Sequence, residues 1–324
     1  MLLVLVTGAS GFLGKHLLEA LVVKGLSVRA LFNRTQPQFN HSLIEWVACD
    51  LLDVYAVEDV MQGIRQVYHC AAIVSFEQKD RDRVIEQNRS ATANVVDEAL
   101  NAGVEKLIHV SSIAALGRAT KENKLISEET HWEESNNNTA YAIGKYRAEM
   151  EVWRGMAEGL DAAIINPGII LGEGNYNEGS AKLFQSAYEE FPWYTLGVNG
   201  WVDVKDVARA AILLMESNIV AERYVLTEGN HSYKDMFTWM ANAMLRKPPH
   251  KHANAFMSKV ARIFSGIKAG FAGKKPLLTR ETVRTAQAIC HYDNAKFLQQ
   301  FPGFTYESMK NTVERVSKDF LKNI

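Results

Sequence analysis

Short apolar runs and longer amphipathic runs alternate through the first half of the chain. The short runs stand between turn residues and have the length of buried strands, whereas the longer runs repeat apolar residues every three or four positions, as helices do. The expected strands are Leu2–Val6, Leu26–Phe32, Glu45–Cys49, Gln66–Ala72, Lys106–Ser111 and Ala162–Asn166. The expected helices are Phe12–Val23, Val54–Met61, Arg81–Ala102 and Tyr141–Glu158. This alternation predicts an α/β fold with a doubly wound parallel sheet.

The second half of the chain is less regular and mostly helical. The expected helices are Ala181–Glu190, Asp203–Met215, Ser232–Leu245, Thr279–Ile289, Asn294–Phe301 and Tyr306–Asn323, with short strands at Trp193–Leu196 and Arg223–Leu226. Gly172–Ser180 is rich in Gly and Asn and is expected to be a loop. Asn254–Ala272 is amphipathic and basic. We interpret it as a packed or solvated helix and not as a membrane-surface helix, because the whole chain is nearly neutral.

The first strand runs directly into three glycines, Gly8-x-x-Gly11-x-x-Gly14, and a helix follows. Gly8 can take backbone angles closed to other residues, Gly11 leaves room for a phosphate, and Gly14 lets the helix pack close to the strand. The N–H groups at a helix start attract the same anion. A tight turn in an ordinary α/β protein is the alternative, but this order of elements favours a dinucleotide site in a Rossmann-type fold. The expected cofactor contacts here are Gly8, Ser10, Gly11, Phe12, Leu13 and Gly14.

The bulk composition excludes several classes of partner. The 324 residues are 47% hydrophobic and 23% charged with a formal net charge of −1, so no overall attraction to nucleic acid or to a membrane is expected. No apolar run approaches the ~20 residues of a membrane helix. The three cysteines lack the paired spacing of a metal site, and no metal is expected. Leu2–Val6 is too short for a secretory signal and lacks its basic flank, so a cytoplasmic protein is expected.

Polar or small residues follow the expected strands, at the edge of a parallel sheet where ligands bind. After the second strand, an acid would hold a ribose 2′-hydroxyl, whereas Asn33 and Arg34 favour a 2′-phosphate and hence NADP over NAD. A solvated loop arginine is the alternative. After the third strand, Asp50 can accept from the adenine amino group while Leu51 covers the ring. The fourth strand ends with a histidine interpreted as a packed core residue and with small residues against which a cofactor can lie: His69, Cys70, Ala71 and Ala72.

Tyr141 and Lys145 stand four residues apart at the start of a helix and therefore share one helical face. The preceding strand ends at Ser111 and Ser112. A free phenol has a pKa near ~10, and a nearby ammonium together with an oxidised nicotinamide favours its ionised form. The tyrosine can then exchange a proton with a substrate hydroxyl or carbonyl, a serine can hold the same oxygen, and the lysine can bond the nicotinamide ribose. The expected catalytic residues are Ser112, Tyr141 and Lys145.

Together these motifs resemble the extended short-chain dehydrogenase/reductase family, a group of NAD(P)-dependent epimerases, dehydratases and reductases. Three further segments match in order: Asn88–Val95 resembles the family's Asn-Val-x-Gly-Thr-x-Asn helix, Asn166–Gly172 its Arg-Pro-x-x-Val-x-Gly segment, and Trp201–Ala208 its Val-x-Val-x-Asp-Val-Ala segment. Ala91 stands where the family has Gly, and Asn166 where it has Arg. The family's catalytic Ser or Thr precedes a glycine by five residues, which selects Ser112 over Ser111 when counted back from Gly117.

The resemblance implies two domains. Residues 1–172 and 201–216 would bind NAD(P), and residues 173–200 and 217–324 would form a smaller, mostly helical substrate-binding lobe. Besides Tyr141 and Lys145, it adds the cofactor contacts Asn88, Val110, Ser111, Pro167, Gly168 and Ile170, and the candidate substrate contacts are Phe76, Ser112, Asn175 and Tyr176. Since the family often pairs through the helices matching Arg81–Ala102 and Tyr141–Glu158, a homodimer is also expected.

Three functions remain open at this point. The first is an NAD(P)-dependent oxidoreductase similar to dihydroflavonol reductases and 3β-hydroxysteroid dehydrogenases, which moves a hydride between nicotinamide and a carbonyl or hydroxyl carbon of a small molecule. The second is a nucleotide-sugar epimerase with bound NAD; the residues after Ser112, Ile113 and Ala114, lack the acid that a dehydratase uses. The third is a non-catalytic dinucleotide-binding regulator, which the complete Ser–Tyr–Lys set disfavours. We favour the first over the second slightly.

Overall fold

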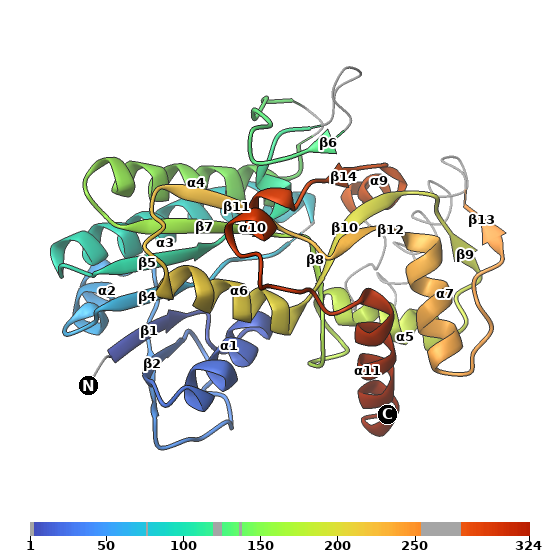
Figure 1. Cartoon of the computed structure of the whole chain (residues 1–324), viewed down its shortest axis with the longest axis horizontal. Coiled ribbons are helices and arrows are strands. Elements are labelled where there is room, and N and C mark those ends of the chain that lie inside the picture. The colour runs from blue at the N-terminus through green and yellow to red at the C-terminus, as the bar shows by residue number, and fades with distance from the viewer. Residues whose placement is uncertain (1–2, 76, 119–124, 136–137, 254–279) are drawn as a thin grey trace. The chain divides into compact units, whose positions relative to one another are not determined.

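The computed structural model describes residues 3–75, 77–118, 125–135, 138–253 and 280–324, and it contains two compact units (Figure 1). The first unit comprises Met1–Gly117, Thr130–Pro167 and Val204–Leu226. The second unit comprises Arg118–Glu129, Gly168–Asp203 and Thr227–Ile324. The basic run Asn254–Ala272, interpreted above as a helix, lies outside the described residues.

The first unit is built on a seven-stranded sheet in the order β11-β7-β5-β4-β1-β2-β3. Its strands are β1 (Leu3–Thr7), β2 (Ser27–Phe32), β3 (Ile44–Ala48), β4 (Gln66–His69), β5 (Lys106–Val110), β7 (Ala162–Pro167) and β11 (Glu222–Leu226). All neighbouring strands are parallel. The predicted α/β fold with a doubly wound parallel sheet is therefore confirmed.

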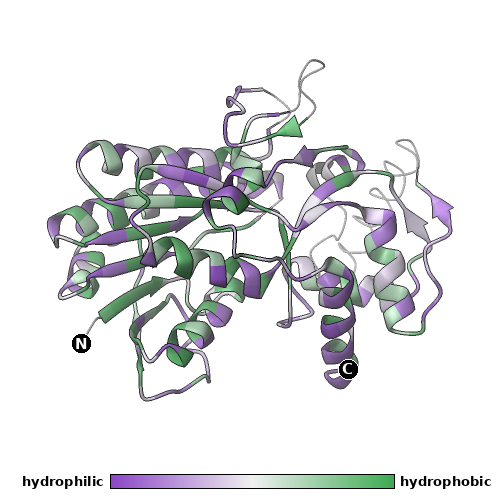
Figure 2. Ribbon diagram, in the orientation of Figure 1, coloured by the Kyte–Doolittle hydropathy of each residue, from purple (hydrophilic) through white to green (hydrophobic). Residues whose placement is uncertain are grey.

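Helices cover both faces of this sheet (Figure 1). They are α1 (Phe12–Val23), α2 (Val54–Met61), α3 (Arg81–Asn101), α4 (Ala140–Ala157) and α6 (Val204–Glu216), with short 3-10 turns η1 (Gln78–Asp80) and η2 (Ile113–Ala115). α1 packs against α6, and α3 packs against α2 and α4. Hydrophobic residues concentrate on the central strands in Figure 2. Because these strands are buried on both faces, they read as continuous apolar runs in the sequence.

The strand order reverses between β1 and β4. β1 pairs with β2 on one side and with β4 on the other, and Thr7 stands opposite His69 at the carboxyl ends of the two strands. Such a reversal opens a crevice outside the sheet, which is where ligands of open α/β sheets bind. The glycine turn and the Cys70–Ala72 segment both leave the sheet at this point.

The second unit contains helices and small sheets. Its strands are β8 (Ile169–Leu171), β10 (Val198–Asp203) and β12 (Gly229–Ser232) in one sheet, β9 (Trp193–Tyr194) with β13 (Lys251–His252), and β6 (Leu125–Ile126) with β14 (His291–Tyr292). Its helical elements are η3 (Gly179–Ala181), α5 (Lys182–Tyr188), α7 (Tyr233–Ala243), α9 (Arg280–Gln287), α10 (Ala295–Gln300) and α11 (Met309–Lys322). α7 packs against α5 and α11 around a core that includes Phe184, Trp201 and Phe320.

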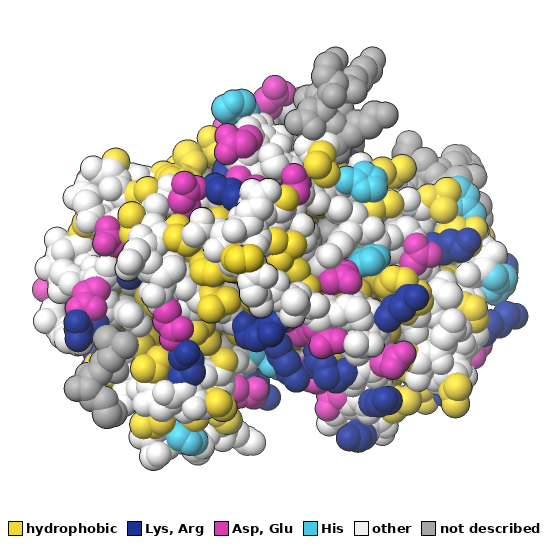
Figure 3. All heavy atoms as spheres, in the orientation of Figure 1, with side chains coloured by type: hydrophobic (Ala, Val, Ile, Leu, Met, Phe, Trp, Pro, Cys, Tyr) yellow, Lys and Arg dark blue, Asp and Glu magenta, His cyan; other side chains and the backbone are white. Residues whose placement is uncertain are grey.

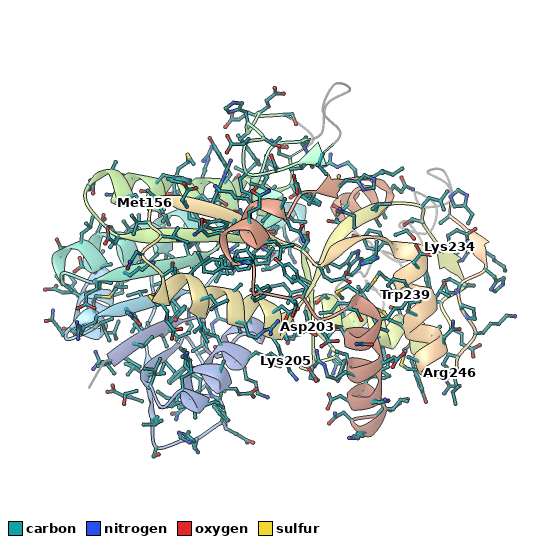
Figure 4. The ribbon with its side chains drawn as sticks, in the orientation of Figure 1. Met156, Asp203, Lys205, Lys234, Trp239 and Arg246 are labelled. Atoms are coloured by element: carbon teal, nitrogen blue, oxygen red, sulfur yellow. The ribbon has the colours of Figure 1, made fainter. Side chains whose placement is uncertain are left out.

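A buried acidic side chain joins β10 to α11 in the second unit. Asp203, labelled in Figure 4, accepts hydrogen bonds from Arg315 and, at 2.7 Å, from the Thr312 hydroxyl of α11. Acidic and basic side chains are interspersed over α7 and α11 in Figure 3. A shallow cavity of about 380 Å³ beside α11 is lined by Glu173, Asn311, Glu314, Arg315, Lys318, Asp319 and Lys322.

The compact units differ in extent from the expected domains at four places. One of them is residues 201–203, which were expected in the cofactor-binding domain and lie in the second unit at the end of β10. Glu222–Leu226, expected in the substrate lobe, forms β11 and pairs with β7 in the first unit's sheet. Residues 118–129 lie in the second unit, where β6 pairs with β14. Residues 168–172 also lie there, because β8 pairs with β10. These differences follow from pairings between strands that lie apart in the sequence, which the pattern of any one strand does not reveal.

Candidate active site

Gly8 and Gly14 let the turn after β1 close. Gly8 has φ 64°, and a Cβ there would lie 2.7 Å from the Ala71 backbone. A Cβ at Gly14 would lie 2.2 Å from the Gly8 carbonyl oxygen. Any side chain at either position would push α1 or the end of β4 away from β1. These two glycines therefore serve the packing of the turn itself.

Gly11 has a different environment, and it fits a phosphate. It is exposed, and a Cβ there would have the Gly8 oxygen, at 3.1 Å, as its one neighbour within 4 Å. Gly11 also begins α1, and no side chain caps that helix, whereas Asp53 caps α2 and Thr139 caps α4. The N–H groups of Phe12, Leu13 and Gly14 are thus left for an anion. The turn has the open backbone that a dinucleotide pyrophosphate requires.

The other predicted cofactor residues of the sheet edge lie at the carboxyl ends of successive strands. Asn33 and Arg34 are exposed after β2, and Asp50 is exposed after β3 with Leu51 half-buried beside the core. β4 ends at His69, three residues earlier than expected. Beyond His69, the Ala71 N–H donates to the Thr7 hydroxyl at 3.2 Å. This bond to a side chain replaces the regular strand pairing, so β4 ends there.

A buried chain of hydrogen bonds connects the glycine turn to α3. The Thr7 hydroxyl bonds His69 Nδ1 at 2.7 Å, and His69 Nε2 bonds the Thr92 hydroxyl at 3.0 Å. The Thr92 hydroxyl donates to the Asn88 carbonyl, and the Asn88 side chain makes two bonds to the Ile73 backbone. His69 is a packed residue as predicted from its run. Of its two threonine partners, Thr92 stands in the Asn88–Val95 segment that resembles a family helix, but neither threonine's bond to His69 was predicted.

We expect the free energy of unfolding to fall as the pH drops below about 6.5, where histidines of the unfolded chain take up protons. Burial lowers the pKa of His69 to about 3 and that of His109 well below 6.5. Both stay neutral in the native state, so each adds a slope of up to about 1.4 kcal/mol per pH unit. Urea unfolding at several pH values between about 7.5 and 4.5 measures this slope.

His109 offers a clean variant for that measurement, since neither of its ring nitrogens has a hydrogen-bond partner. His109→Leu should flatten the pH dependence, and His250→Leu, at an exposed position, should leave it as it is. An unchanged slope in His109→Leu would show that another group titrates.

Ser112, Tyr141 and Lys145 come together in the first unit. Ser112 follows β5, caps η2 through the Ala114 N–H, and its side chain is hydrogen-bonded with Tyr141. Tyr141 and Lys145 lie on α4, which Thr139 caps and which packs closely on α3 because Gly144 lies against the Val84 carbonyl. The Lys145 ammonium donates to the Val110 carbonyl at 2.8 Å and is 3% exposed. The predicted catalytic set is thus one cluster.

Burial sets the protonation of this cluster. It raises the pKa of Tyr141 above its usual value of 10, and the hydrogen bond with Ser112 opposes it. The phenol is therefore protonated at neutral pH and can donate. Burial lowers the pKa of Lys145 to about 8, against the charge of Glu149. The ammonium form thus predominates only below about pH 8.

The remaining predicted residues lie in three places. Ser111 donates its N–H to the Ile165 carbonyl, and Pro167 ends β7. Phe76 lies outside the described residues. Four others belong to the second unit, and their roles toward cofactor or substrate stay predictions: Gly168, Ile170, Asn175 and Tyr176.

Those four have distinct surroundings within the second unit. Gly168 packs on Gly200, where a Cβ would meet the carbonyl oxygen at 2.5 Å, and Ile170 pairs with β10. Asn175 is exposed in a loop. The Tyr176 ring contacts Phe320, and its hydroxyl donates to Asp319 at 2.7 Å, so this side chain holds α11 in place.

No metal site or membrane span is found in the parts of the chain that the structure describes. Within these ranges no three His, Cys, Asp or Glu side chains are grouped to hold a metal ion. No described helix is both long and apolar enough to cross a membrane.

Comparisons with known proteins agree with this geometry. A family model described as "NAD dependent epimerase/dehydratase family" matches residues 4–226. The sterol demethylase protein B of Methylococcus capsulatus is 30% identical over 242 residues, which cover 73% of each chain. Cinnamoyl-CoA reductase 1 of Petunia hybrida is 30% identical over 243 residues, 69% of this chain and 72% of that protein.

Solved structures share the fold over nearly the whole chain. The structure of gox2253 has a TM-score of 0.83 at 27% identity and covers 99% of this chain and 98% of its own. The UDP-glucose 4-epimerase of Thermus thermophilus, in complex with NAD, has a TM-score of 0.77 at 21% identity and covers 100% of both chains.

The reversed strand order with a glycine turn at the reversal defines a Rossmann-type nucleotide-binding protein. The chain belongs to the NAD dependent epimerase/dehydratase family. The resemblance to extended short-chain dehydrogenases/reductases is confirmed. The sequence analysis did not identify Glu149 and Arg223, which lie beside the candidate catalytic cluster. Glu149 could have been found from its position, because a carboxylate four residues after Lys145 lies on the same helical face.

Proposed function

We propose that this protein is an NAD(P)-dependent oxidoreductase that transfers a hydride between nicotinamide and a carbonyl or hydroxyl carbon, with Tyr141 as the general acid and base. The observation that carries the proposal is the Ser112–Tyr141–Lys145 cluster at the carboxyl end of β5, in which Ser112 and Lys145 are buried and Tyr141 is half-buried. Relatives named as a cinnamoyl-CoA reductase and a sterol demethylase protein support an organic carbonyl or hydroxyl compound as substrate.

Each residue of the cluster has one task in this proposal. The glycine turn and the strand ends from Asn33 to Ala72 hold the dinucleotide, which supplies the hydride-transfer chemistry when bound. Tyr141 gives its proton to the substrate oxygen in reduction and takes it back in oxidation. Ser112 holds that oxygen by a hydrogen bond. Lys145 places a positive charge near the tyrosine and can bond the nicotinamide ribose.

The two units divide the work in the same proposal. The first unit binds the dinucleotide and carries the proton-transfer residues, and the second unit binds the substrate. We also propose a homodimer formed through α3 and α4, by analogy with the family. Sedimentation of the purified protein gives its mass directly, and a monomer at micromolar concentration would contradict the dimer.

The decisive experiment compares net redox turnover with isomerisation. We expect added NADPH or NADH to be oxidised in the presence of an aldehyde or ketone panel that includes aromatic thioesters and 3-ketosteroids. Conversion of UDP-glucose without net change in nicotinamide absorbance would support a nucleotide-sugar epimerase with bound NAD. Dinucleotide binding without either reaction would support a regulator.

We propose NADP as the preferred cofactor, because Arg34 is exposed at the end of β2 where no carboxylate excludes a 2′-phosphate. Arg34→Ala should weaken NADP binding roughly tenfold, the loss expected for one exposed charged hydrogen bond to a phosphate, and should leave NAD binding unchanged. Calorimetric titration of each cofactor measures both. A tighter complex with NAD in the unaltered protein would remove Arg34 from this role.

A further inference from the structure

Glu149 is a fully buried carboxylate beside the catalytic cluster. It lies on α4 one turn beyond Lys145, with 0% exposure. Its Oε1 accepts from the Asn166 amide at 2.5 Å, and its Oε2 accepts from Arg223 at 3.3 Å. A buried charge is costly unless it is paired and hydrogen-bonded, and these partners favour the ionised form of Glu149 against the burial that raises its pKa.

Asn166 connects Glu149 to the backbone of the catalytic serine. The same amide nitrogen that donates to Glu149 donates to the Ser112 carbonyl at 3.0 Å. Asn166 stands in β7 where the family usually has Arg. The guanidinium comes instead from Arg223 in β11, the neighbouring strand. In this chain the Asn166 amide therefore lies between the Glu149 carboxylate and the Ser112 carbonyl. The arginine that pairs with Glu149 comes from β11, the strand next to β7.

Glu149 also acts on Lys145 through its charge. Three other described groups interact electrostatically with Lys145: Cys70, His69 and His109. Burial raises the pKa of the Cys70 thiol to about 12 and lowers the pKa of both histidines, so these three are neutral at pH 7. Among the described groups, Glu149 is thus the one whose charge favours the ammonium, while burial raises its own pKa and the Arg223 and Asn166 contacts oppose that rise.

We propose that Glu149 is a positioning residue of the active site: through Asn166 it fixes the strand end that carries Ser112, and its charge favours the ammonium form of Lys145. The inference rests on the proposed function, because Ser112 and Lys145 matter here as members of the catalytic set. Glu149 itself touches neither the reacting atoms nor the cofactor in this assignment.

The first test is Glu149→Gln, which removes the charge, keeps the size of the side chain and leaves one acceptor oxygen where Glu149 has two, for Asn166 and Arg223. We expect the pKa of Lys145 to fall by about one unit, as for loss of a near opposite charge. Competitive acetylation of the cofactor-free protein, followed by peptide mass spectrometry, measures this pKa without any reaction. The alkaline limb of kcat/KM should move to lower pH by the same amount.

Glu151→Gln is the matched control. Glu151 lies on the same helix and pairs with Arg89 and Arg154, so the variant also loses ion pairs but none near Lys145. It should leave the Lys145 pKa unchanged. An unchanged Lys145 pKa in Glu149→Gln would overturn the electrostatic role. If that variant does not fold, Glu149→Gln with Arg223→Gln removes both charges of the ion pair, and a downward shift of the Lys145 pKa is still expected, because Glu149 lies one helical turn from Lys145 on α4.

The second test addresses the amide bridge. Asn166→Leu should lower kcat roughly 10- to 100-fold through misplacement of Ser112, with a smaller change in the Lys145 pKa than Glu149→Gln gives. Unchanged kcat would overturn the bridging role. The acetylation result is independent of the proposed reaction: if Tyr141→Phe retained full turnover, the proposed function would fail while the Lys145 shift would still report on Glu149.

Discussion

Tyr141→Phe is expected to lower turnover roughly 10²–10⁴-fold, the usual contribution of general acid–base catalysis. The substitution removes only the hydroxyl, which is hydrogen-bonded with Ser112, and leaves the ring on the buried face of α4. The glycine turn lies at the ends of β1 and β4 and does not depend on that hydroxyl. Dinucleotide affinity should therefore stay within about twofold, and calorimetry together with steady-state kinetics separates the two effects.

Tyr146→Phe is the matched control for this variant. Tyr146 lies on the same helix with its ring stacked on Trp132 at 4.5 Å, so losing its hydroxyl tests the helix without touching the cluster. It should retain turnover. Tyr141→Phe with the turnover of the unaltered protein would exclude Tyr141 as the acid and base.

A second large effect is expected at the glycine turn, where two Gly→Ala variants should fail in different ways. Gly14→Ala puts a Cβ 2.2 Å from the Gly8 oxygen, so α1 must shift, and such overpacking costs about 1–3 kcal/mol or more. Gly11→Ala meets little protein and should keep the free energy of unfolding within about 0.5 kcal/mol. It should nevertheless weaken dinucleotide binding at least tenfold, because its methyl group occupies the open side where a phosphate would approach.

Urea unfolding and cofactor titration of both variants measure these effects. Gly303→Ala serves as the control, since no atom lies within 4 Å of a Cβ at that position. Equal stability of Gly11→Ala and Gly14→Ala would contradict the close packing of α1 on β1. Unaltered cofactor affinity in Gly11→Ala would place the pyrophosphate elsewhere.

Much of the first unit was predictable because its signals are local. The strands are buried on both faces and appear as apolar runs, and the helix Val54–Met61 was predicted to the residue. The glycine spacing and the four-residue interval between Tyr141 and Lys145 also depend on neighbours in sequence. β4 ended three residues early because a side chain from another strand, Thr7, redirects its end.

What the sequence left unpredicted depends on distant contacts. β10 pairs with β12 on one side and with β8 on the other, but none of the three has an apolar run long enough to distinguish a strand from a loop. The Tyr176 hydroxyl bonds Asp319, 143 residues further along the chain, a contact that was not predicted. Glu149 and Arg223 meet only once β7 and β11 are adjacent. Pairings of this kind have no local pattern from which they could be inferred.

The sheet of the first unit is completed late in synthesis. β11 covers the edge of β7 only after the chain has passed through about 60 further residues, which takes about 3–12 s at typical translation rates. During that time β7, buried along its whole length in the folded protein, has an open strand edge, and such edges recruit other chains. During the same interval the Lys106 ammonium lacks the Leu214 and Ser217 carbonyls, which accept its hydrogen bonds in the folded protein. Protection by chaperones is therefore expected to matter most while residues 168–226 are being made, and a fragment that ends near residue 167 should aggregate even though it carries the glycine turn and all three proposed catalytic residues.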